Sequence, residues 1–252
     1  MPQTDTQHHY WLKKQFVVKE QYVKWYSPNL SKDIEMLVFG ERGYPVIVFP
    51  TSMGSYYENK DFKLIESAAW FLENGLIKIY CPDGVDKLSW YNRKISPADR
   101  VKNHIWYDMM LYHELVPRAA YETGIHRVAT AGCSFGGYHA TNFGFRHPDK
   151  VKYILNMSAA FDIRSHLDGH YDENVYFNNP VDFLPNAQND LFYDMLAILG
   201  TGEHDICLDA NIKMAQLLGS KGIPNWLDIR QGAVHDWPIW RIMFPHYLSL
   251  LK

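Results

Sequence analysis

The feature that most constrains this chain is a G-x-S-x-G pentapeptide, Gly132-Cys133-Ser134-Phe135-Gly136. It directly follows the apolar run at residues 127–131 and directly precedes a helix-like segment, so we expect a strand, one tight turn and a helix. Glycines are needed because the serine backbone is strained and larger flanking side chains would collide with the strand and the helix. Such a turn lifts the serine hydroxyl clear of the sheet, beside a helix N-terminus that favours negative charge. The pattern predicts Ser134 as a nucleophile.

The α/β-hydrolases that use this turn carry the acid and then the histidine after the serine. Asp205 follows the apolar run at residues 195–200, and His235 follows the strand-like segment at residues 226–230. Both side chains therefore lie in loops just past a predicted strand, at the sheet edge where ligands bind in open α/β sheets. We predict a triad of Ser134, Asp205 and His235.

Other residues compete for the acid and the base. Glu203 shares a loop with Asp205, which we prefer because it lies further past the strand and has room to turn back. The acid must also reach the imidazole from a different loop, and the base must follow the acid in the chain. Glu203 remains the reserve acid, and the residues set aside are Asp228, Asp236, His113 and His204.

Composition limits the possible partners. The 252 residues carry a formal charge of −3 without a basic cluster, so we do not expect nucleic acid as a partner. The three cysteines lack disulfide-framework spacing, no secretory signal is visible, and no apolar stretch approaches ~18 residues. We therefore expect a cytoplasmic protein that does not contact membranes. We take Cys133 as a small buried residue beneath the turn.

The order of predicted elements indicates a single α/β domain spanning residues 1–252. Two strands open the chain as an antiparallel edge, and later strands alternate with helices, as in a mostly parallel sheet with helices on both faces. A polar segment at residues 162–193 is expected to be an insertion of short helices. The predicted strands are 16–24, 33–39, 45–50, 76–81, 128–133, 151–157, 195–200 and 226–230, and the predicted helices are 62–73, 97–122, 136–146, 208–219 and 238–251.

The helix at 97–122 has the clearest start signal. Ser96 can cap it, Pro97 fits its first position, and Asp99 completes a capping box. Gly124 ends it, and Pro117 could bend it.

Taken together, the chain resembles an esterase family of α/β-hydrolases that includes S-formylglutathione hydrolase (esterase D), enterochelin esterases and mycobacterial mycolyltransferases. Four segments carry the resemblance, and together they span most of the chain from about residue 20. They are the strand and loop at 45–54, the loop at 81–92, the turn at 132–137, and the acid and base segments at 202–205 and 235–237. The resemblance implies a carboxylic-ester hydrolase that uses the matching triad.

The resemblance also implies an oxyanion hole. Its first donor is the backbone amide of Phe135, which follows from the turn itself. Relatives usually carry His-Gly where Pro50-Thr51 stands here, so either Thr51-Ser52 or Met53-Gly54 could supply the second donor. We choose Ser52 from the alignment of the loop.

The loop at 81–92 is placed over the nucleophile by the same resemblance. Trp90 and Tyr91 are therefore expected to form a substrate wall, and Tyr56 and Tyr57 lie in a loop that should border the pocket. These expectations describe a serine esterase that acts on a small-molecule ester through an acyl-enzyme, with no metal and no cofactor. An acyltransferase of the same fold and a non-catalytic binding protein are the alternatives, and the oligomeric state is left open.

Overall fold

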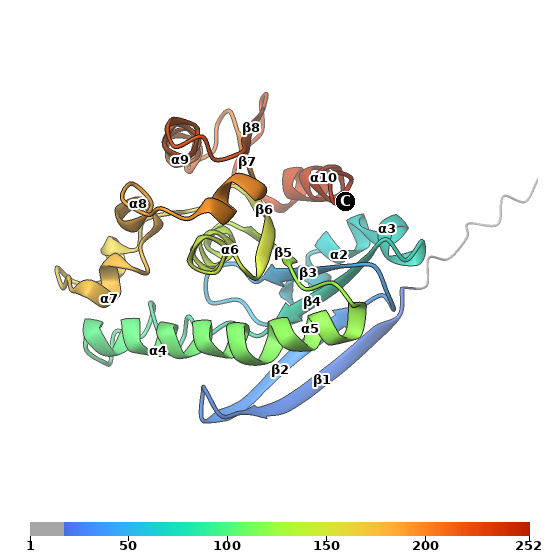
Figure 1. Cartoon of the computed structure of the whole chain (residues 1–252), viewed down its shortest axis with the longest axis horizontal. Helices are drawn as coiled ribbons and strands as arrows, with labels where there is room; N and C mark the ends of the chain where they lie inside the picture. The colour runs from blue at the N-terminus through green and yellow to red at the C-terminus, as the bar shows by residue number, and fades with distance from the viewer. Residues whose placement is uncertain (1–17) are drawn as a thin grey trace, which may run out of the picture.

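The protein is described by a computed structural model that covers residues 18–252. Its centre is an eight-stranded sheet in the order β1-β2-β4-β3-β5-β6-β7-β8. The first two strands pair antiparallel with each other, and β2 pairs antiparallel with β4, whereas all later pairs are parallel. Figure 1 shows the β1–β2 hairpin at one edge and the β7–β8 pair at the other. The predicted fold class, including its antiparallel N-terminal edge, is confirmed.

The bounds of the elements are as follows. The strands are β1 (Glu20–Ser27), β2 (Lys32–Phe39), β3 (Tyr44–Phe49), β4 (Ile77–Pro82), β5 (Val128–Cys133), β6 (Val151–Met157), β7 (Leu196–Gly202) and β8 (Asn225–Arg230). The α-helices are α1 (Glu58–Asp61), α2 (Leu64–Ser67), α3 (Ala69–Glu73), α4 (Pro97–Met110), α5 (Val116–Thr123), α6 (Phe135–Arg146), α7 (Glu173–Tyr176), α8 (Pro180–Phe183), α9 (Leu208–Ser220) and α10 (Trp237–Leu248). A π-helix, η1 (Leu111–Leu115), joins α4 to α5, and two 3₁₀ helices, η2 (Arg164–His166) and η3 (Asp190–Asp194), lie between β6 and β7.

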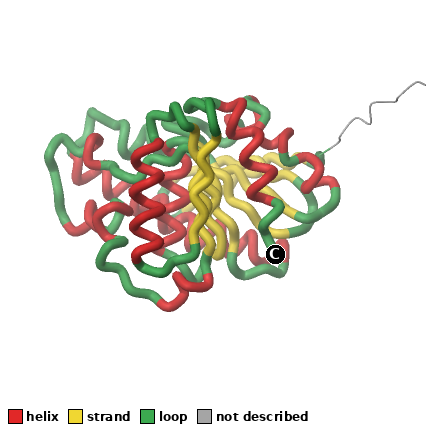
Figure 2. The backbone as a smooth tube through the Cα atoms, turned by 90° about the horizontal axis from the view of Figure 1, so that it is seen from above, coloured by secondary structure: helices red, strands yellow, loops and turns green. Residues whose placement is uncertain are grey.

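Alternating apolar side chains of the sheet bury two separate cores. In β3, Ile47 and Phe49 face the core covered by α4, α5, α6 and α9, whereas Val46 and Val48 face the core covered by α2, α3 and α10. Figure 2 shows the strands enclosed between helices on both sides. Because both faces are covered, only the ends of the strands are available for a site, and the carboxyl ends of the parallel strands meet at one edge.

The structure differs from two of the predicted helices. The helix expected at 62–73 is split into α2 and α3, and Lys63 before them has a left-handed backbone with φ of 61°. The helix expected at 97–122 runs through η1, where the backbone widens just before Pro117. Proline lacks the N–H that a regular turn needs, and a π-turn accommodates that loss without breaking the helix. Part of the strand expected at 16–24 lies outside the described residues.

None of the helices in residues 18–252 is both long enough and apolar enough to span a bilayer.

Candidate active site

Ser134 lies in a strained turn at the carboxyl end of β5. Its φ of 54° and ψ of −120° are uncommon for a residue other than glycine. The turn is tight, since a Cβ on Gly132 would lie 2.2 Å from the carbonyl carbon of Gly136. A Cβ on Gly136 would lie 2.6 Å from the carbonyl oxygen of Pro50, at the end of the neighbouring strand β3. Only glycine fits at these two positions, so the backbone holds Ser134 at the start of α6 as the pentapeptide predicts.

The three predicted triad side chains meet at this edge of the sheet. His235 Nε2 lies 3.0 Å from Ser134 Oγ, and His235 Nδ1 lies 2.8 Å from Asp205 Oδ1. The histidine comes from the loop between β8 and α10, and the aspartate from the loop between β7 and α9. These loops follow parallel strands, which is why residues 101 and 30 positions away from His235 reach the same ring.

The Asp205 carboxylate is held by more than the histidine. Ser158 Oγ donates to its Oδ2, and the Cys207 amide donates to its Oδ1 at 2.7 Å. Trp240 Nε1 in turn donates to Ser158 Oγ at 2.8 Å, so the serine is fixed from α10. Burial raises the pKa of Asp205, but the hydrogen bonds from His235, Ser158 and Cys207 outweigh it and lower the pKa. Asp205 is therefore held as a carboxylate.

Sequence reasoning missed Ser158 and Trp240. Ser158 directly follows β6 and has a left-handed backbone with φ of 56°, so its place at a strand end was the available signal. Nothing local marks Trp240, which lies inside α10 and contacts Ser158 across 82 residues.

The competing acids are engaged elsewhere. Glu203 Oε2 accepts a hydrogen bond from the Gly232 amide at 2.9 Å, which ties the two loops together without touching the imidazole. The Asp236 side chain accepts from the Trp237 amide and caps α10, and Asp228 binds Arg230 and the Tyr247 hydroxyl. Asp205 is the carboxylate that reaches His235.

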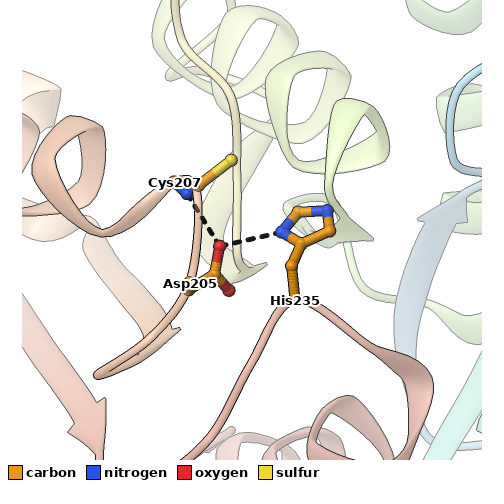
Figure 3. A group of neighbouring side chains, drawn as sticks. All are labelled: Asp205, Cys207 and His235. Carbon is orange, nitrogen blue, oxygen red and sulfur yellow. Dashed lines mark hydrogen bonds and ion pairs between the residues drawn. The ribbon is translucent and has the colours of Figure 1, made fainter.

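Cys207 lies beside the histidine–aspartate pair (Figure 3). Asp205, Cys207 and His235 each offer one ligand atom, and these atoms lie within 4.8 Å of one another. A metal ion held by all three would have to displace the hydrogen bond between His235 Nδ1 and Asp205 Oδ1. Burial lowers the pKa of His235, but its hydrogen bond with Asp205 and the nearby Cys207 more than offset this and raise the pKa to about 9.

The backbone amides of Phe135 and Ser52 have no acceptor among residues 18–252. Both residues sit where neighbouring strands end, since Phe49 of β3 is paired with Gly132 of β5. The other amides of the loop after β3 are occupied, because Thr51 donates to Glu58, Met53 to Asp86 and Gly54 to the Thr51 carbonyl. Of the amides considered from sequence in this loop, Ser52 is the one without an acceptor among the described residues.

The prediction of Trp90 as a substrate wall is wrong. Its side chain has 0% exposed surface and packs in a core cluster against His104 and Tyr138, with ring centroids 4.8 and 6.0 Å away. A ring without exposed surface cannot contact a substrate. The next residue, Tyr91, is only partly buried, and its hydroxyl donates to Ser52 Oγ at 2.9 Å. The aromatic loop therefore presents Tyr91, not Trp90, beside the loop after β3.

Comparison with protein-family models and with curated proteins finds no match to this sequence. Solved structures match over nearly the whole chain. A ferulic acid esterase is 22% identical, with a TM-score of 0.73 over 92% of this chain and 96% of that one. An S-formylglutathione hydrolase from Agrobacterium tumefaciens is 13% identical, with a TM-score of 0.73 over 93% and 94%. The enzyme of that name from Staphylococcus aureus is also 13% identical, with a TM-score of 0.66 over 92% and 96%.

These neighbours define the fold. The chain has the α/β-hydrolase fold, and it shares that fold with S-formylglutathione hydrolases and ferulic acid esterases. The structural resemblance expected from the sequence motifs is confirmed at this level.

Proposed function

We propose that this protein is a serine ester hydrolase that acts through Ser134, His235 and Asp205. The observation that carries the proposal is the continuous chain of contacts from Ser134 Oγ through the imidazole to the Asp205 carboxylate, at 3.0 and 2.8 Å. A fold shared with solved esterases supports the same reaction class. The substrate is a small-molecule carboxylic ester.

The reaction starts with proton transfer, because a neutral serine hydroxyl is a weak nucleophile. As Ser134 Oγ attacks the ester carbonyl carbon, His235 Nε2 takes its proton, and Asp205 holds Nδ1–H and stabilises the imidazolium. The tetrahedral intermediate collapses, His235 returns the proton to the leaving alcohol, and an acyl-Ser134 ester remains. Water then attacks this ester with His235 again as the base, which releases the acid and restores the serine.

The oxyanion of each tetrahedral intermediate is assigned to the amides of Phe135 and Ser52. Neither N–H group has an acceptor in the described part of the chain, and the two residues follow the paired strands β3 and β5. Fixed amides of this kind stabilise charge that develops in the transition state, and removal of one such donor costs ~10²–10³ in rate.

An acyltransferase of the same fold would use the same first half-reaction and differ only in the acceptor of the acyl group. Partitioning of the acyl-enzyme between water and an added alcohol such as glycerol separates the two activities. A non-catalytic role is disfavoured because all three triad side chains are present and in contact.

The decisive experiment combines turnover with active-site labelling. Wild-type protein should hydrolyse p-nitrophenyl esters and gain the mass of one fluorophosphonate adduct on Ser134. Ser134→Ala should lose the adduct and lower kcat by ~10⁴-fold or more while keeping its Tm, since the change removes one hydroxyl. Ser220→Ala, which alters an exposed serine at the end of α9, is the control and should behave as wild type. Labelling of Ser134→Ala at the wild-type rate would refute the assignment.

A further inference from the structure

The loop after β3, residues 50–57, is shaped by carboxylates that lie outside it. Glu58 accepts hydrogen bonds from the Thr51 amide at 2.6 Å and from the Thr51 hydroxyl at 2.9 Å. The approach is close, since a Cβ on Gly54 would lie 2.5 Å from a carboxylate oxygen of Glu58. Thr51 is thereby fixed through both its backbone and its side chain.

Asp86 holds the other side of the loop. Its Oδ2 accepts from the Met53 amide at 3.1 Å, and its Oδ1 lies 2.9 Å from His139 Nε2. The side chains of Asp86 and His139 are only 3% and 4% exposed, so solvent does not compete for these contacts. His139 lies on α6, one turn after Phe135. Asp86 therefore connects the loop after β3 with the helix that begins at the nucleophile.

These contacts leave a specific amide free. The amides of Thr51 and Met53, on either side of Ser52, are taken by Glu58 and Asp86. Met53 has a left-handed backbone with φ of 57°, an uncommon conformation that the surrounding structure must maintain. Released from Asp86, the Met53 peptide could rotate and carry the preceding Ser52 N–H away from the nucleophile.

The negative charge of Glu58 and Asp86 does not explain why they lie beside the loop after β3. A carboxylate near a developing oxyanion repels it, so neither Glu58 nor Asp86 is useful as a source of electrostatic stabilisation. Glu58 and Asp86 must therefore act by fixing the backbone, because each accepts a hydrogen bond from an amide next to Ser52. Burial raises the pKa of Glu58, which reduces the negative charge that this side chain carries near neutral pH.

We propose that Asp86 is a positioning residue that, together with His139 and Glu58, fixes the Ser52 amide as an oxyanion donor. The inference rests on the proposed esterase function and adds the residues that assemble its oxyanion hole. Asp86 does not touch the reacting atoms and acts only through the Met53 backbone.

The first test compares Asp86→Ala with Asp83→Ala. Asp83 is a matched control because its Oδ1 accepts from the Tyr56 amide of the same loop at 3.1 Å, but four residues beyond Ser52. We expect Asp86→Ala to lower kcat for p-nitrophenyl acetate by ~10²-fold, as for loss of one oxyanion donor, with KM changed less than twofold. Asp83→Ala should lower kcat by less than threefold. Equal losses in the two variants would overturn the proposal.

The second readout is the ratio of kcat/KM for an ester to that for its thionoester, in which sulfur replaces the carbonyl oxygen. A fixed pair of amides discriminates against the larger, weaker-accepting sulfur, so wild type should prefer the oxygen ester strongly. If Asp86→Ala loses one donor, the ratio of kcat/KM for the oxygen ester to that for the thionoester should fall at least tenfold. A merely destabilised enzyme would lose both activities in the same proportion, and that result would also overturn the proposal.

Conservative variants keep the test valid if Asp86→Ala does not fold. The Asp86→Asn variant retains an oxygen acceptor for the Met53 amide and should recover most of kcat. Glu58→Gln should likewise retain activity, whereas Glu58→Ala should reproduce the loss and the narrowed thionoester ratio. Wild-type activity in Glu58→Ala, or no recovery in a folded Asp86→Asn, would count against positioning. Failure of the esterase proposal is recognised separately, because then wild type would neither turn over esters nor be labelled at Ser134.

Discussion

The turns that follow β5 and β3 lie next to each other at one edge of the sheet, yet they are built differently. Each contains a residue other than glycine in the left-handed region, Ser134 with φ of 54° and Met53 with φ of 57°. The β5 turn is held by packing, because its glycines leave no room for a Cβ. The β3 turn is held by hydrogen bonds to Glu58 and Asp86, which come from other segments.

This difference shows two ways to maintain a strained backbone. In the β5 turn the strain is balanced by close packing, at Gly132 within the turn itself and at Gly136 against the backbone of Pro50 after β3. In the β3 turn it depends on a carboxylate 33 residues away from the amide that it holds. We therefore expect substitutions around the β5 turn to lower activity when they remove a reacting group. Around the β3 turn, we expect activity to fall even when the substituted residue does not touch the substrate.

The largest expected effect in this comparison lies on the nucleophile side, at the acid. Asp205→Asn should lower kcat by ~10⁴-fold, because the amide cannot hold the imidazole with Nδ1 protonated. Glu203→Gln is the matched control, since its remaining oxygen can still accept from the Gly232 amide, and it should lose less than fivefold. Steady-state kinetics of both variants checks this, and the reverse ranking would move the acid to Glu203.

The pH profile tests how Cys207 affects the base. His235 must be neutral to accept the serine proton, so kcat/KM should rise with pH through its pKa of about 9. At pH 7, below this pKa, most of the rings in the free enzyme are protonated. Cys207→Ala removes a neighbouring group that raises this pKa, so the midpoint should move to lower pH and kcat/KM at pH 7 should increase severalfold.

The raised pKa of His235 also makes the stability of the fold depend on pH. A pKa raised above its ordinary value of 6.5 means that the protonated ring favours the folded state. That contribution is complete below pH 6.5 and is lost as the pH rises to about 9, and Cys207→Ala should diminish the loss. Thermal melts between pH 6 and 10 check this, and an unchanged midpoint in both the kinetic and the melting profiles would show that Cys207 does not act on His235.

Trp90 precedes Tyr91, which contacts the loop after β3. We expect a substitution of Trp90 to affect stability rather than substrate binding. Trp90→Ala removes a fully buried ring and should lower the free energy of unfolding by about 3–5 kcal/mol. Activity on acetyl and bulky esters should fall in the same proportion at a temperature where both proteins are folded. Trp90→Phe, which keeps most of the packing, is the milder control. A rise in KM confined to bulky esters would restore Trp90 as a substrate wall.

The contrast between the β5 and β3 turns also explains which site residues could be predicted from the sequence. Ser134, Asp205 and His235 could be placed because each lies directly after a strand that its apolar run makes visible, and parallel strands bring such loops together. Asp86 and Ser158 also follow strands, but they belong to no motif with a fixed chain order, and their hydrogen-bond partners are fixed only by the packed fold. Trp90 shows the limit most plainly: adjacent aromatics in a loop do not reveal which ring turns inward.

The smallest expected effect concerns the hydroxyl of Tyr91. It donates to Ser52 Oγ at 2.9 Å, and its ring packs edge-on against Phe135 with centroids 5.6 Å apart. Tyr91→Phe keeps the ring and removes one exposed hydrogen bond, which is worth about 1 kcal/mol, so kcat should fall by no more than about fivefold. Ser52→Ala removes the same bond while keeping the backbone amide, and it should give a similar loss. Because both variants delete one interaction, the double variant should be no worse than either single variant. Additive losses would instead mean that Tyr91 and Ser52 act separately, and the β3 turn would then be held by its carboxylates without help from the aromatic loop.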